Sequence, residues 1–269
     1  MINFDTLKYQ LVRGVLIPYM NVRIYQPTIH EIDEILPSYD SYKYIYCASK
    51  DFLQFEEGES LDAFKDNTYF QTLFKMKNKL YFRILLSSLE FFLNIKIAND
   101  NIRISNDMKI AIVDDEGKNI LFTLDDSNFE EFSELIRLIC CCEKMTNEED
   151  KDHLKPTTVY KSEALRKMYE DSIKQYNDYQ DKKKRENAFT LADIIGSISI
   201  NEKTKYKFED IDKLTMWQLY YIYNGMFVRE GNEFTKMQFC SYKFSFENPP
   251  DFNWVKEAKV KLPESMIKQ

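Results

Sequence analysis

Along residues 15–36 the hydrophobic pattern changes its period, from every second position to every third or fourth. Met20, Val22 and Ile24 alternate with polar positions, as the buried face of a short strand does. This pattern predicts a β-hairpin, or two short strands, over residues 15–26. The rest of the stretch has the period of a helix.

Three residues encode the corner between strand and helix. Pro27 has no N–H to donate to a strand ladder, so we expect the strand to end before it. Thr28 stands three residues before Glu31, which is the spacing of a capping box at a helix start. The apolar stripe expected on this helix is Ile29, Ile32, Ile35 and Leu36. Local sequence therefore explains the change of period without any catalytic role.

Further along the first half, the pattern predicts helices and one small sheet. Helices are expected at residues 41–51, 66–76 and 78–94, and strands at 101–105, 109–113 and 118–124 with an acidic turn at 114–117. The helix over 78–94 should bury Leu80, Ile84, Leu85, Leu89, Phe92 and Leu93. Ser127 and Glu130 have capping-box spacing before a helix with buried Phe129, Phe132, Leu135, Ile136 and Ile139.

The composition changes after Met145. Residues 146–158 are polar and contain Pro156, as in an exposed linker. A charged helix with a weak apolar stripe is expected over 159–187, followed by helices over 189–200, 216–228 and from residue 252. We therefore predict a mainly helical α+β fold, in which an N-terminal domain of short antiparallel hairpins packed on helices precedes a helical block. The predicted parts are domain 1–145, linker 146–158 and helical region 159–269.

Composition narrows the class of protein. Of 269 residues, 44% are hydrophobic and 15% are aromatic, which supports a packed core. The net charge of −7 argues against a nucleic-acid-binding surface, and the one basic run, residues 182–185, is flanked by acids.

The most apolar stretch, residues 80–98, contains Arg83, Glu90 and Lys96, so we read it as a core helix rather than a membrane span. The N-terminus lacks the pattern of a signal peptide, so we expect a cytoplasmic protein.

No residue pattern predicts a catalytic, metal or cofactor site. His30 and His153 have no partner nearby in sequence that would make them a base or a ligand. The run Cys140–Cys142 ends an apolar helix, where buried packing explains it, and no cysteine spacing indicates a disulfide framework. The acids at 114–116 and 125–126 fit a hairpin turn and a helix start better than a calcium loop.

Two segments instead suggest contact with another protein. The helix over 159–187 has too weak a stripe to be well buried, and the helix over 216–228 carries aromatics on more than one face, although core packing explains part of that set. The candidate partner-binding residues are Leu165, Met168, Tyr169, Tyr176, Trp217, Tyr220 and Tyr221.

Three stretches together resemble a known family. They are the strand and corner at residues 22–32, the strand and acidic helix at 120–137, and the closing helices at 191–199 with 211–220. With these the sequence resembles the tail assembly chaperones of long-tailed bacteriophages that infect Gram-positive hosts. The family usually has a glycine in the loop before its final helices, whereas this chain has Asn248, Pro249 and Pro250.

The resemblance implies a non-enzymatic protein of the host cytoplasm, without cofactor, that holds the tape-measure protein or another tail component during virion morphogenesis. It also allows a homo-oligomer. Two other functions fit the same sequence: a structural virion subunit of the tail, baseplate or connector, and a phage inhibitor that binds a host protein. An enzyme would instead require a polar pocket with clustered titratable groups.

Overall fold

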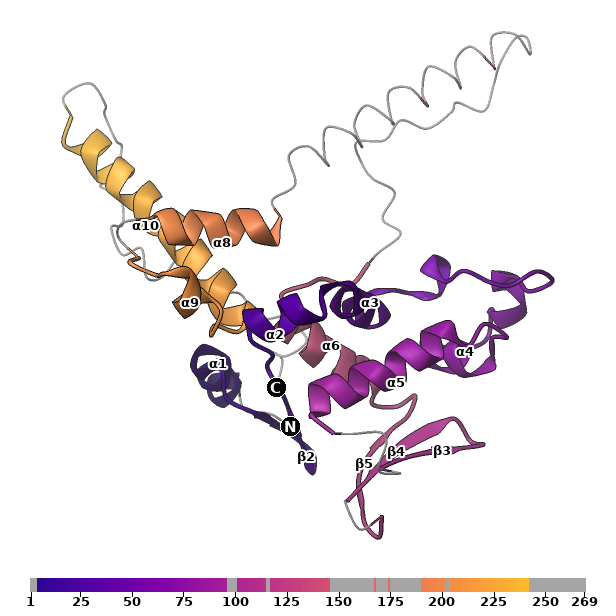
Figure 1. The fold of residues 1–269 in the computed structure, drawn as a ribbon. Coiled ribbons are helices and arrows are strands. Elements are labelled where there is room, and N and C mark those ends of the chain that lie inside the picture. The colour runs from indigo at the N-terminus through magenta and orange to yellow at the C-terminus, as the bar shows by residue number, and fades with distance from the viewer. Residues whose placement is uncertain are drawn as a thin grey trace. The chain divides into compact units, whose positions relative to one another are not determined.

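The computed structural model, drawn in Figure 1, describes residues 4–95, 101–114, 117–145, 190–201 and 204–241, together with Lys167 and Lys174. By its internal contacts the chain divides into two units, residues 1–145 with 195–269 and residues 146–194. The fold is α+β, as predicted: two small antiparallel sheets pack against helices, and further helices follow toward the C-terminus. The predicted linker 146–158, the helix 159–187 except for Lys167 and Lys174, and the helix from residue 252 lie outside the described residues.

The elements before residue 146 are α1 (Phe4–Arg13), β1 (Ile17–Tyr19), β2 (Val22–Ile24), α2 (Ile29–Glu34), α3 (Leu36–Cys47), the 3₁₀ helices η1 (Lys50–Phe52) and η2 (Leu61–Phe64), α4 (Tyr69–Lys75), α5 (Leu80–Leu93), β3 (Ile102–Ser105), β4 (Lys109–Val113), β5 (Ile120–Leu124) and α6 (Phe129–Cys140). Those after residue 190 are α8 (Leu191–Ile200), α9 (Phe208–Ile211) and α10 (Met216–Phe239).

The first sheet is the predicted hairpin. Tyr19 pairs with Val22 across a two-residue turn, and Val22 and Ile24 are buried on one face. The expectation that Met20 shares this face is wrong, because Met20 occupies the turn, has φ 50° and is 61% exposed. A two-residue hairpin turn needs positive φ, so a residue there cannot continue the alternation of the strand.

The corner after the hairpin has the predicted capping box. The Thr28 hydroxyl accepts the N–H of Glu31 at 3.3 Å, and the Glu31 carboxylate accepts the N–H of Thr28 at 2.8 Å. Ile29 and Ile32 are buried, as expected, whereas Leu36 is 40% exposed. The stripe ends early because α2 ends at Glu34, and the φ of −123° at Ile35 breaks the helix before α3 begins.

The second sheet has the strand order β3-β4-β5, and its strand β5 packs against α6. Phe122 of β5 lies against Phe132 of α6 with ring centroids 5.7 Å apart, and Tyr19 of the hairpin contacts both rings. The five apolar residues predicted on α6 are all buried. This cluster joins both sheets to one helix.

Two further local predictions for the residues before 146 are wrong. The capping box at Ser127 does not form: α6 begins at Phe129 after Asn128, whose side-chain oxygen accepts the N–H of Asp125, while Asp125 binds Ser127. Asp125 therefore takes the hydroxyl that the box would use. In α5, Leu80 is 56% exposed because it is the first residue of the helix and projects beyond the core. Of the other residues expected inside α5, Ile84 is half-buried and the remaining four are buried.

The described part of the unit 146–194 includes the start of α8. The Thr190 hydroxyl accepts the N–H of Asp193 at 3.2 Å, and the Asp193 carboxylate accepts the N–H of Thr190 at 2.8 Å. This reciprocal pair fixes the start of the helix that was predicted over 189–200. No helix in the described part of the chain is long and apolar enough to cross a membrane.

Candidate interaction surfaces

The start of α10 is fixed against the N-terminal part of the chain. Thr215 caps the helix and forms an isolated antiparallel bridge with Thr28. The N–H of Ile29 donates to the Leu214 carbonyl at 2.8 Å, and the Gln218 amide donates to the Val12 carbonyl at 2.8 Å. α10 also contacts α1 and α6. Its first turns are therefore part of the core.

This position separates the three aromatic residues predicted on α10 for partner binding. Trp217 is 1% exposed, so its ring packs in the core and is not offered to a partner. Tyr220 is half-buried. Burial is the largest cause that raises the pKa of its hydroxyl, and the nearby Cys141 raises it further. Tyr221 is 36% exposed and stacks on Trp217 with ring centroids 5.2 Å apart. Of the three, Tyr221 presents the most surface. Leu165, Met168, Tyr169 and Tyr176 lie outside the described residues.

The second half of α10 carries exposed apolar side chains that the sequence analysis missed. The helix was expected to end at Val228, but it continues to Phe239. Phe227, Phe234 and Met237 are 49%, 58% and 66% exposed. The spacing of seven and three residues between them is typical of one helix face and could have predicted it. The helix was predicted to end at Val228 because most residues after it are polar.

These side chains form one stripe with Tyr223. At 100° per residue, Tyr223, Phe227, Phe234 and Met237 fall within about 80° of the helix circumference and span about 21 Å of its length. Tyr223 and Phe227 touch, with ring centroids 4.7 Å apart. Glu230 falls inside the stripe, where it accepts a hydrogen bond of 2.9 Å from Asn201. We call Tyr223, Phe227, Phe234 and Met237 the α10 stripe.

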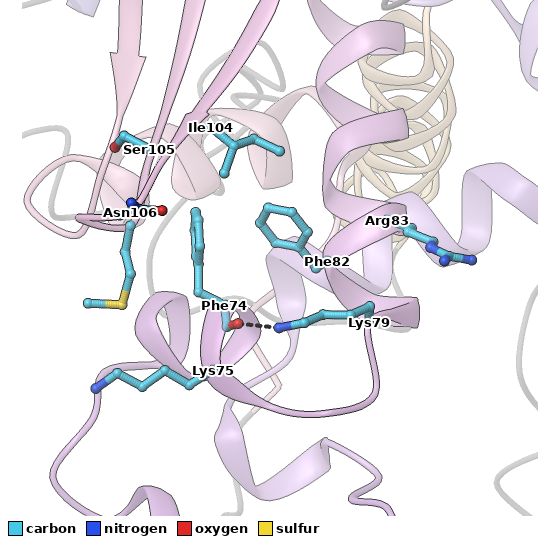
Figure 2. A pocket seen from close by; sticks show the side chains of 9 residues that line it. Phe74, Lys75, Lys79, Phe82, Arg83, Ile104, Ser105 and Asn106 are labelled. Carbon is cyan, nitrogen blue, oxygen red and sulfur yellow. Dashed lines mark hydrogen bonds between the residues drawn. The ribbon is translucent and has the colours of Figure 1, made fainter.

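A second feature is a broad, open hollow of about 660 Å³ between α4, α5 and the β3–β4 turn, shown in Figure 2. Its floor is the tilted ring pair Phe74 and Phe82, with centroids 4.6 Å apart. Ile104 lies above these rings in Figure 2. The full lining is Phe74, Lys75, Lys79, Phe82, Arg83, Ile104, Ser105, Asn106 and Met108.

The rim of the hollow is basic, although the whole chain has a charge of −7. The Lys79 ammonium donates to the Phe74 carbonyl, drawn as a dashed line in Figure 2, and the Lys75 ammonium donates to the Asn67 side-chain oxygen. Neither acceptor neutralises a charge, and no carboxylate within the described ranges forms an ion pair with Lys75, Lys79 or Arg83. The hollow is therefore chemically suited to an acidic group beside an apolar one.

The residues considered for chemistry have structural partners. His30 lies 3.6 Å from Glu34 on the surface, and His153 is outside the described residues. Asp114 accepts hydrogen bonds from Lys118 and Asn119 in the hairpin turn. Within the ranges that the structure describes, no three His, Cys, Asp or Glu side chains gather as metal ligands do.

The acidic residues before α6 also accept hydrogen bonds. Asp125 accepts from the Ser127 N–H at 2.9 Å, and Asp126 accepts from Gln71 at 3.1 Å and from the Thr68 hydroxyl. These bonds tie the start of α6 to the start of α4. Their geometry is that of caps and turns rather than of a cation site.

Comparisons of the chain with protein families, curated proteins and solved structures give no match.

Proposed function

We propose that this protein is a non-enzymatic tail assembly chaperone of a long-tailed bacteriophage. In the host cytoplasm it covers an apolar helical segment of the tape-measure protein, or of another tail component, until the tail tube polymerises. The observation that carries the proposal is the α10 stripe, three of whose members expose about half or more of their side chains. Exposed apolar side chains gathered along one helix face are typical of sites that bind another polypeptide.

The dimensions of the stripe favour a helical client. A stripe about 21 Å long matches roughly four turns of a partner helix, and apolar residues spaced by three, four and seven positions are the contacts of helix-to-helix recognition. Tape-measure proteins, as the family resemblance implies, are long and helical with apolar segments. The negative charge of the chain keeps copies apart while such a surface is open.

Co-expression of the full chain with a tape-measure protein, followed by affinity capture, tests the proposal. The double change Phe234→Ser with Met237→Ser removes two exposed anchors of the stripe, so we expect affinity to fall about 30-fold or more. Phe239→Ser is the matched control, because Phe239 is exposed on a different face of the same helix. It should leave affinity within about threefold.

Two results would overturn the proposal. One is capture of the client by the double variant at the strength of the wild type. The other is recovery of the protein from purified phage particles by mass spectrometry, since a chaperone leaves before the tail is complete and a structural subunit remains.

A further inference from the structure

Two cysteines far apart in the sequence have their sulfur atoms in contact. The Sγ atoms of Cys47, at the end of α3, and Cys142, just after α6, are 3.2 Å apart, with the Cys47 thiol donating. Cys47 is buried and Cys142 is half-buried, so Cys142 is the more exposed of the two. A disulfide has an S–S length near 2.05 Å, so the sulfurs have only about 1.2 Å to close.

The two backbones are already fastened beside each other. The N–H of Met145 donates to the carbonyl of Cys47 at 2.7 Å. The buried Arg137 of α6 donates to the neighbouring Tyr46 carbonyl at 2.7 Å. These two hydrogen bonds hold the end of α3 and the segment after α6 side by side, where the two sulfur atoms meet.

The other cysteines differ in their partners. Cys140 is buried beside Cys142, and the Cys141 thiol donates to the Leu138 carbonyl at 3.8 Å. Cys240 is exposed at the end of α10. A hydrogen bond with Cys140, together with burial, raises the pKa of Cys142 to about 12, so at neutral pH the pair rests as two thiols.

We propose that Cys47 and Cys142 form a reversible intramolecular disulfide when the protein meets a small-molecule disulfide such as oxidised glutathione. The Cys142 thiolate attacks one sulfur of the oxidant and releases one thiolate, and the Cys47 thiolate then attacks Cys142 and releases the second. One S–S bond replaces two S–H bonds, two protons leave, and the two electrons reduce the oxidant to two thiols. The new bond fastens residues 141–145 to α3.

The full chain treated with oxidised glutathione tests this site. After non-reducing digestion with trypsin, we expect residues 44–50 to be linked to residues 138–144. Because the second peptide contains three cysteines, fragmentation must assign the linked one to Cys142. A closed loop of this length should raise the Tm by on the order of 10 °C, and dithiothreitol should reverse the rise.

Matched variants separate this site from its neighbours. Cys142→Ser should abolish both the link and the rise in Tm, and Cys240→Ser should change neither. The double variant Cys140→Ala with Cys141→Ala removes the other two thiols at residues 140–142 and keeps Cys142, so the link should persist. Absence of a Cys47 link in the oxidised wild type, or a link to Cys140, Cys141 or Cys240 instead, overturns the proposal. The test does not depend on the proposed client.

Discussion

Glu31 shows how one side chain can serve several neighbours. Its carboxylate accepts the N–H of Thr28 and also the Tyr25 hydroxyl, at 2.6 and 2.7 Å. Partial burial opposes ionisation of Glu31, but the hydrogen bonds from Tyr25 and Thr28 outweigh it and lower the pKa of the carboxyl. The capping box was readable in the sequence, whereas the Tyr25 bond required the strand to fold back over the corner.

The lowered pKa of Glu31 predicts a pH dependence of stability. Ionised Glu31 is favoured by the fold, so its contribution is complete above its ordinary pKa of about 4.5 and is lost as the pH falls through the lower folded pKa. Glu31→Gln should lower the free energy of unfolding by about 0.5–1 kcal/mol at pH 7, a small value because solvent screens this partly exposed carboxylate. The deficit should shrink as the pH falls below 4.5 in thermal unfolding followed by circular dichroism. A deficit that stays constant with pH would contradict the proposed role of the charge.

At the scale of elements, α10 is the main departure from expectation. The apolar pattern predicted a helix over 216–228, and the structure extends it to Phe239. Glycines at 225 and 231 lower helix propensity but do not stop this helix, and a Cβ at either would meet nothing within 4 Å. Helix length was thus set by the absence of a strong terminator rather than by apolar content.

Two glycine substitutions should act in opposite directions. Gly231→Ala places a better helix former in open space, so unfolding free energy should rise by about 0.5–1 kcal/mol. Gly14→Ala should destabilise by more than that, because Gly14 has φ +62° and its added Cβ would lie 3.0 Å from the Gln218 amide nitrogen. Urea unfolding of both variants measures the difference. A gain from Gly14→Ala would show that the α1–α10 junction is not built as described.

At the scale of the whole molecule, the first unit is assembled from two separate stretches of chain. Residues before 146 supply both sheets and α1 to α6, while α10 supplies the buried Trp217. The bridge between Thr28 and Thr215 joins the two stretches at the corner between β2 and α2. A change in α10 should therefore be felt throughout this unit.

Trp217→Ala should lower the unfolding free energy by about 3–5 kcal/mol, because it empties a large buried volume. Hydrogen exchange should speed up in α1 and α6 as well as in α10, since the elements share one core. Tyr221→Ala, which removes the half-exposed ring stacked on Trp217, should cost under about 1 kcal/mol. Exchange that speeds up in α10 alone would mean that its folding is independent of the N-terminal elements.

The sequence by itself determined the local architecture. Alternation and turn residues were enough for the hairpin and the three-stranded sheet, and Thr28 was identified as a cap because capping depends on neighbours within four residues. The buried face of α6 followed from its period. The capping box at Ser127 failed because Asp125, also nearby, competes for the same hydroxyl.

The tertiary structure alone decided which surfaces are open and which distant residues meet. Whether an aromatic residue of α10 lies in the core, as Trp217 does, or faces solvent, as Phe234 does, depends on where α1 and α6 cover the helix. The basic hollow joins α4 and α5 to a strand turn, and Cys47 meets Cys142 across 95 residues. Such contacts depend on packing between elements, which periodicity within one element does not encode.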